Sequence, residues 1–159
     1  DGDGERAAAI FAQIVEMAPD SVAAQSGLIR ALTAAGMLEE AAAALAALPE
    51  DLRKDAAIAQ AATALELAGT RVDDSELAGL RAAAADPANL EAQLAFAEAA
   101  FAAGERDEAA ATLLAAIGHD PAWNEGAAKA KLLQFFEAIG LEDPWVAAQR
   151  RKLSLLLFG

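Results

Sequence analysis

A 34-residue period runs through most of this chain and restricts the folds open to it. Glycines recur on this grid at Gly2, Gly36 and Gly104, and each has an acidic residue three positions later and an alanine five positions later. An acidic series keeps the same spacing, at Glu5, Glu39, Asp73 and Asp107. A repeat of this length indicates helix-turn-helix units stacked on one another rather than one compact globule. Such stacks generally bind other proteins, so the period predicts binding rather than chemistry.

The composition favours helices along the whole chain. Alanine dominates, and the 159 residues include only 11 Gly and 5 Pro. Alanine has the highest intrinsic helix propensity, and small side chains let neighbouring helices approach closely. We therefore predict an all-α fold, a helical solenoid of antiparallel helix pairs that ends in a two-helix cap.

The charge is uneven along the sequence. The formal net charge is -13, but residues 1–128 carry -15 and residues 129–159 carry +2. An acidic body argues against binding of phosphate backbones, so nucleic acid is excluded as a partner. The chain has no Cys, and no apolar run approaches the roughly 18 to 20 residues of a membrane span. We expect a cytoplasmic protein that contacts neither membranes nor nucleic acids.

Following the period gives a division of the chain into units. We expect one repeat domain over residues 1–159, with helices at 22–35, at 123–139 and from Pro144 to about Leu157. Gly36, Gly104 and Gly140 end helices, and Asp143 caps the last one. The expected units are 1–21 (second helix of a truncated unit), 22–53 (repeat), 54–87 (degenerate repeat), 88–121 (repeat) and 122–159 (capping helices).

The first helix begins in the middle of a unit. Residues 5–18 carry Ala7, Phe11 and Ile14 on one stripe, but the helix that would pair with them on the grid would precede Asp1. We therefore expect an exposed apolar edge here. It is covered either by an upstream part of a longer chain or by a second copy in a homodimer.

The grid resembles the tetratricopeptide repeat, with small residues at the centre of the first helix, Ala at the start of the second and Pro at the unit end. The tail is more specific. Gly140 to Pro144, Val146 and the run from Arg150 to Phe158 resemble the end of the YbbN/CnoX family of thioredoxin-like co-chaperones. The segments 86–89, 103–109 and 133–136 are also similar to the last repeats of that family.

This resemblance implies a function that the period alone does not. Members of that family are bacterial cytosolic co-chaperones with an N-terminal thioredoxin-like domain upstream of the repeats. They hold unfolding client proteins, hand them to the GroEL chaperonin, and also associate with the DnaK system. The resemblance thus implies GroEL, DnaK and clients as partners; the alternative is a structural scaffold or oligomerisation module without client holding.

The last helix is the candidate docking site. Val146, Arg150, Leu153 and Leu157 share one helical stripe, while Leu155 and Phe158 project elsewhere, so its end is apolar nearly all round. Either both faces are buried in the cap, or one face docks a partner as helix-in-groove binding requires. We expect Arg150, Arg151 and Lys152 to form ion pairs with acidic residues of the repeats. The candidate protein-binding residues are Arg150, Arg151, Lys152, Leu153, Leu155, Leu156, Leu157 and Phe158.

Other motifs favour structural interpretations. His119 and Asp120 lack a nucleophile, and a His at a helix C-terminus is stabilised there by the helix dipole. Trp123 and Trp145 follow prolines at helix starts and are expected in the core of the cap. We predict no catalytic, cofactor-binding or metal-binding residues, and hence no enzyme.

Overall fold

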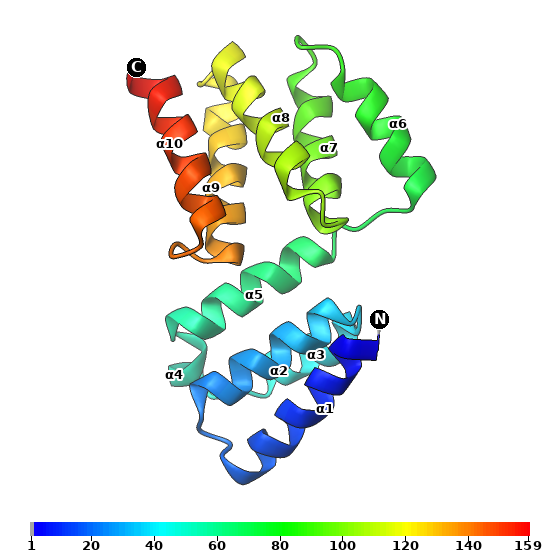
Figure 1. Cartoon of the computed structure of the whole chain (residues 1–159), viewed down its shortest axis with the longest axis vertical. Coiled ribbons are helices and arrows are strands. Elements are labelled where there is room, and N and C mark those ends of the chain that lie inside the picture. Colours follow the sequence, from blue (N-terminus) through cyan, green and yellow to red (C-terminus); the bar gives the residue numbers. More distant parts are fainter. Residues whose placement is uncertain (1) are drawn as a thin grey trace. The chain divides into compact units, whose positions relative to one another are not determined.

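The computed structural model describes residues 2–159, and helices are the only regular secondary structure among them (Figure 1). Ten α-helices and one short 3-10 helix form within these residues, with no strand among them. This confirms the predicted all-α fold. The chain divides into two compact units, which meet in sequence between Gly69 and Thr70. Asp1, the first residue of the expected segment 1–21, lies outside the described residues.

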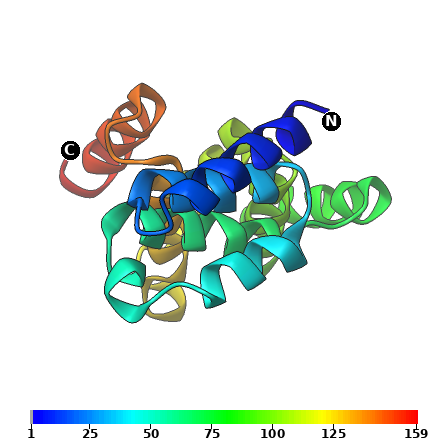
Figure 2. The same cartoon turned by 90° about the horizontal axis from the view of Figure 1, so that it is seen from below.

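The first unit contains five helices. In both views α1 runs alongside α2 (Figures 1 and 2), and α2 also packs against α3 and α5. The short α4 precedes α5, in a region where the period predicted only a junction between units. The helices are α1 (Gly2–Met17), α2 (Val22–Ala34), α3 (Leu38–Ala46), α4 (Glu50–Arg53) and α5 (Ala56–Ala68).

The second unit contains five α-helices and the 3-10 helix. α7 packs against α6 and α8, and α9 and α10 both pack against α8. The expected unit 54–87 therefore contributes α5 to the first compact unit and α6 to the second. The helices are α6 (Asp74–Ala84), α7 (Leu90–Ala102), α8 (Arg106–His119), η1 (Trp123–Gly126), α9 (Ala127–Ile139) and α10 (Pro144–Phe158).

Helix starts follow the 34-residue grid through their N-caps. Ser21, Asp55 and Asn89 occupy one grid position, and each side chain accepts a hydrogen bond from a backbone N–H two or three residues on. Such caps satisfy donors that have no partner within the helix. At the turns, Gly36 and Gly104 have φ of 77° and 87°, a backbone conformation that favours glycine.

A hydrogen bond from a buried glutamine to the preceding loop also repeats on the same grid. The side chain of Gln25 donates from Nε2 to the carbonyl oxygen of Pro19 at 2.8 Å. Gln93, 68 positions later, donates in the same way to the carbonyl oxygen of Asp86 at 3.3 Å. Both glutamines are buried. Each one ties the first turns of its helix to the loop that precedes it.

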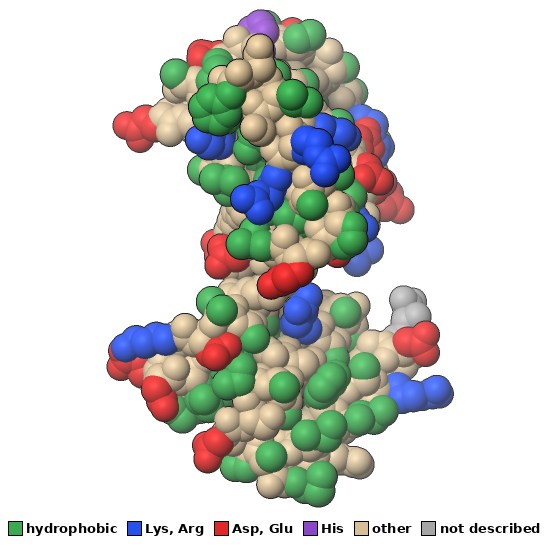
Figure 3. Space-filling model, turned by 60° about the vertical axis from the view of Figure 1, so that its left-hand side comes forward, with side chains coloured by type: hydrophobic (Ala, Val, Ile, Leu, Met, Phe, Trp, Pro, Cys, Tyr) green, Lys and Arg blue, Asp and Glu red, His purple; other side chains and the backbone are tan. Residues whose placement is uncertain are grey.

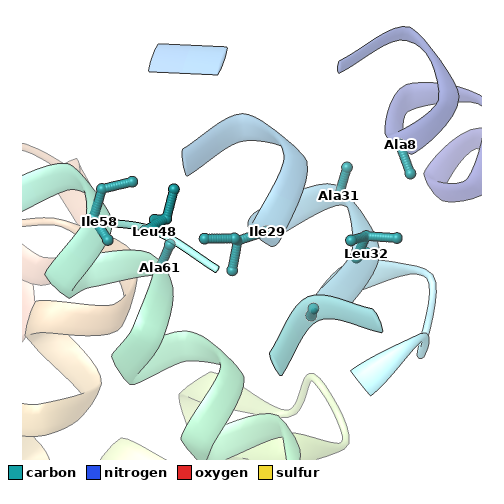
Figure 4. Packing of buried hydrophobic residues seen from close by; sticks show 8 residues of the cluster. Ala8, Ile29, Ala31, Leu32, Leu48, Ile58 and Ala61 are labelled. Atoms are coloured by element: carbon teal, nitrogen blue, oxygen red, sulfur yellow. The ribbon is translucent and has the colours of Figure 1, made fainter. Parts of the chain in front are cut away.

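The core of the first unit gathers around Ile29 of α2. Figure 4 shows this side chain facing Leu48, Ile58 and Ala61, while Leu32 and Ala31 lie on the side of Ala8. Phe11, expected on an exposed edge, instead packs half-buried over Gly27, where a Cβ would occupy the space of the Phe11 ring. The large exposed apolar side chains of α1 are Ile10 and Met17.

The core of the second unit is built on aromatic rings. Phe101 of α7 and Phe135 of α9 stack with centroids 4.0 Å apart and planes 5° from parallel. Phe135 and its neighbour Phe136 are fully buried. Beside the stack, Lys131 of α9 pairs with Glu98 of α7 at 3.0 Å. These contacts fasten α9 to α7.

The predicted helix at 123–139 is wrong in its first four residues. They form η1, within which Asn124 and Glu125 have φ of 46° and 58°, followed by Gly126 at 80°. The α-helix starts only at Ala127. Trp123 stands at the grid position held elsewhere by Ser21, Asp55 and Asn89, and an indole has no acceptor with which to cap a helix. This position therefore lacks the side-chain cap that Ser21, Asp55 and Asn89 provide at the other helix starts, and three successive residues adopt positive φ instead.

Arg81 joins α6 to the helices beside it. Its guanidinium lies 2.9 Å from one carboxylate oxygen of Glu108, also pairs with Glu105, and sits 5.3 Å above the ring of Phe96. The hydrogen bond from Arg81, helped by its positive charge, holds the pKa of Glu108 below its ordinary value of 4.5, against partial desolvation. The pair therefore favours the folded state only while Glu108 is ionised.

A pH dependence follows from the lowered pKa of Glu108. The contribution of the Arg81–Glu108 pair to the free energy of unfolding is complete above the unfolded-state pKa of 4.5. It is lost as pH falls through the lower folded-state pKa of Glu108. We expect Arg81→Gln to remove this part of the acid sensitivity. The effect is small because the side chains are more than 40% exposed. Urea titrations at several pH values measure it, with exposed Arg71→Gln as control; parallel pH profiles for wild type and Arg81→Gln would contradict it.

Candidate functional site

The start of α10 is fixed by a cap. Asp143 accepts a hydrogen bond from the backbone N–H of Trp145 at 2.8 Å, and Pro144 occupies the first helical turn. Proline suits this position because its ring presets the helical φ and its missing N–H has no partner there anyway. The helix therefore begins where the sequence predicts, at Pro144.

Trp145 anchors α10 to the helices beside it. Its indole N–H donates to Asp107 at 2.6 Å, and the guanidinium of Arg106 lies 5.0 Å from the ring. Phe136 of α9 meets the same ring edge-on at 6.3 Å. Three contacts of different kinds thus hold the first turns of α10 to the start of α8 and to α9. This network is absent from the sequence-based prediction, which placed Trp145 in the core of the cap without partners.

One face of α10 is buried. Val146, Gln149 and Leu153 point into the unit and are almost inaccessible to solvent. The predicted stripe included Arg150 at this point, but Gln149 takes the inward position and Arg150 is exposed. Leu153, one of the predicted docking residues, is therefore a core residue. Leu157, another of them, is half-buried.

The last two turns of α10 also present apolar side chains to solvent. Leu155, Leu156 and Phe158 are 67%, 44% and 85% exposed. Arg151 and Lys152 lie one to two helical turns before these three residues and are also exposed. We call these five residues, Arg151, Lys152, Leu155, Leu156 and Phe158, the C-terminal tip. Figure 3, which brings the α10 side of this unit forward, shows hydrophobic and basic side chains side by side there.

The basic residues of α10 form no ion pairs with described acidic residues of the repeats. Within the described part of the chain, no carboxylate lies within 4.0 Å of the charged groups of Arg150, Arg151 or Lys152. The expected ion pairs are therefore not formed. Leu156 packs partly against α8: its Cδ1 lies 3.2 Å from the position that a Cβ would occupy on Gly118. Leu155 and Phe158 are the most exposed apolar side chains of the tip.

The first unit carries a groove that sequence reasoning missed. It has a volume of about 740 Å³ and runs between α1 and α3 over the surface of α2. Alanines along α1 leave the space open where larger side chains would fill it. We call it the α1–α3 groove; its lining residues are Glu5, Ala8, Ala9, Ala12, Leu28, Leu32, Met37, Glu40 and Ala44.

Other kinds of site find no support within residues 2–159. No cluster of three or more His, Cys, Asp or Glu side chains there is arranged to hold a metal ion. No helix there has the length and apolar character that a membrane crossing requires.

The stacked helix pairs, the turn glycines and the two unpartnered surfaces together define a helical-repeat protein-binding scaffold. A family model described as Tetratricopeptide repeat matches residues 70–158, and a second model of the same description matches residues 1–65. The chain belongs to the tetratricopeptide-repeat family. Repeats of this family generally mediate protein–protein interactions and are typically non-catalytic. No curated protein and no solved structure matches the chain significantly.

Proposed function

We propose that this chain is the repeat module of a co-chaperone that docks to the GroEL chaperonin through its C-terminal tip. The observation that carries the proposal is the exposure of Leu155 and Phe158 beside unpaired basic side chains. The choice of GroEL rests on the resemblance of the tail to the YbbN/CnoX family. The same resemblance supports an upstream thioredoxin-like domain, association with the DnaK system, client holding and a bacterial cytoplasmic location.

The tip has the chemistry of a helix that docks in a partner's groove. Burying a leucine or phenylalanine side chain contributes about 1.5 to 3 kcal/mol. Part of this gain is offset by ordering the partners, and a helix that is already held in place reduces that cost. The contacts of Trp145 with Asp107 and Arg106 hold α10 in this way. The basic residues add attraction for an acidic partner surface.

We expect the double variant Leu155→Asp/Phe158→Asp to weaken binding of the chain to GroEL by at least about tenfold, because each change replaces an apolar anchor by a charge. Biolayer interferometry on immobilised GroEL measures this. The matched control is Ala147→Asp/Ala148→Asp, which places the same two charges on exposed residues of the same helix, about two turns before Leu155. Control and wild type should bind equally.

Two further outcomes decide the docking assignment. Circular dichroism of the double variant should match that of the wild type, because both substituted side chains are exposed. If the folded double variant binds GroEL as tightly as the wild type, the tip is not the docking site. If the wild type itself does not bind, the chaperonin is not the partner.

The second candidate function is a scaffold or oligomerisation module that uses α1. Its support is the exposure of Ile10 and Met17 on that helix. An α1-to-α1 dimer would be lost in Ile10→Asp, whereas Phe11 is an unsuitable position because its ring belongs to the core. Light scattering on the wild type and on Ile10→Asp tests the oligomerisation role; a monomeric wild type excludes that role.

A further inference from the structure

The α1–α3 groove has the features of a binding site for an apolar helix end. Its floor consists of Leu28 and Leu32 of α2, and small alanines from α1 and α3 form its walls. Its volume of about 740 Å³ lies within the range of roughly 300 to 1,000 Å³ typical of ligand sites. The only charged residues in its lining are Glu5 and Glu40, and neither carboxylate makes an ion pair with a described residue.

The C-terminal tip is the chemical complement of this groove. The groove is apolar with two unpaired carboxylates, while the tip is apolar with the unpaired cations of Arg151 and Lys152. The charge of the surroundings matches as well. Residues 1–69 carry a net charge of -7, and residues 150–159 carry +3 with no acidic residue.

The two surfaces also agree in length. Along α1 the groove extends from Glu5 to Ala12, and along α10 the tip extends from Arg151 to Phe158. Each stretch advances seven residues, which is about 10 Å of helix axis. A tip laid along the groove would thus place its basic end and its apolar end within the groove at the same time.

We propose that the α1–α3 groove binds the C-terminal tip of a second copy of this chain. The contact is heterologous, since one copy supplies the groove and the other the tip, so it leads to chains or rings rather than a closed twofold dimer. Five tip residues are far fewer than the roughly 20 to 30 residues a side of a stable interface, so association is weak and concentration-dependent. The inference rests on the proposed function only in taking the tip as a docking element.

A complementation experiment tests this arrangement. Leu155→Asp/Phe158→Asp replaces two apolar side chains of the tip by carboxylates and leaves the groove unchanged. Ala9→Arg keeps the tip and places a positive charge on an exposed wall of the groove. Each variant alone should sediment as a monomer at concentrations where the wild type associates. An equimolar mixture should form a one-to-one complex, because one partner still offers a groove and the other a tip.

Matched controls and a second groove variant keep the test decisive. Ala42→Arg adds the same charge to an exposed residue of α3 outside the groove and should associate like the wild type. If Ala9→Arg fails to fold by circular dichroism, Glu40→Lys replaces it and should weaken association by about tenfold. A wild type that stays monomeric at every concentration, a mixture that stays monomeric, or groove variants that associate normally would each overturn the proposal.

The test of self-association can be distinguished from the test of GroEL binding. Ala9→Arg retains an intact tip, so it should bind GroEL like the wild type while losing self-association. If GroEL does not bind but the mixture pairs, the contact between copies stands and the chaperonin assignment falls. If GroEL binds and the mixture does not pair, the chaperonin assignment stands and the contact between copies is wrong.

Discussion

Phe135→Ala should lower the free energy of unfolding of the second unit by about 3 to 5 kcal/mol. Phe135 is fully buried, and its ring stacks on Phe101 at 4.0 Å. Removing the ring therefore loses its transfer free energy, leaves a cavity between α7 and α9, and abolishes a stacked aromatic pair. Because α9 carries Phe136 against Trp145, the loss should also loosen the anchor of α10.

Urea unfolding followed by tryptophan fluorescence measures this effect. Both tryptophans, Trp123 and Trp145, belong to the second unit, so the signal reports that unit. Leu133→Ala is the matched control, since it truncates an exposed apolar side chain of the same helix and should change little. A loss for Phe135→Ala no larger than that for Leu133→Ala would contradict the packing described for α9.

The second large effect is expected from Ile29→Ala in the first unit, at about 2 to 5 kcal/mol. Ile29 is fully buried and faces Ile58 and Ala61 of α5 as well as Leu48 after α3 (Figure 4). Its side chain thus lies where α2 meets the later part of the unit. Alanine neighbours contribute little volume of their own, so they cannot fill the space that truncation leaves.

Thermal or urea unfolding followed by circular dichroism tests Ile29→Ala. The tryptophans do not report on this unit, so helix content is the signal of choice. Ile10→Ala on α1 is the control, because it removes the same atoms from an exposed position. Equal effects of the two substitutions would show that Ile29 is not the centre of the core.

Local signals in the sequence predict most helix ends. Gly36 and Gly104 end helices at positive φ because only glycine adopts that conformation at low cost, and a glycine at a fixed spacing is visible in the sequence. The cap at Asp143 is visible for the same reason. The start of α9 was mispredicted because Trp123 is the first apolar residue of the predicted helix, whereas Asn124, Glu125 and Gly126 adopt positive φ, which residue spacing does not reveal.

The surfaces were harder to predict than the helices. Helical spacing places Leu155 and Phe158 away from Val146, but it does not reveal whether another helix covers them. The α1–α3 groove depends on how far apart two helices lie, which no residue spacing encodes. Its alanines were visible in the sequence as good helix formers, and their second effect, leaving space between helices, emerges only in three dimensions. Phe11 was misplaced because Gly27, on another helix, makes room for its ring.

We propose that the C-terminal tip is the surface through which this chain meets a larger partner. Hydrogen–deuterium exchange of the chain with and without GroEL tests it most directly, because amides near a helix end exchange fast enough to show added protection. We expect slower exchange in residues 151–158 when GroEL is present, with exchange in α2 and α7 unchanged. Unchanged exchange in residues 151–158, with or without protection elsewhere, would contradict it.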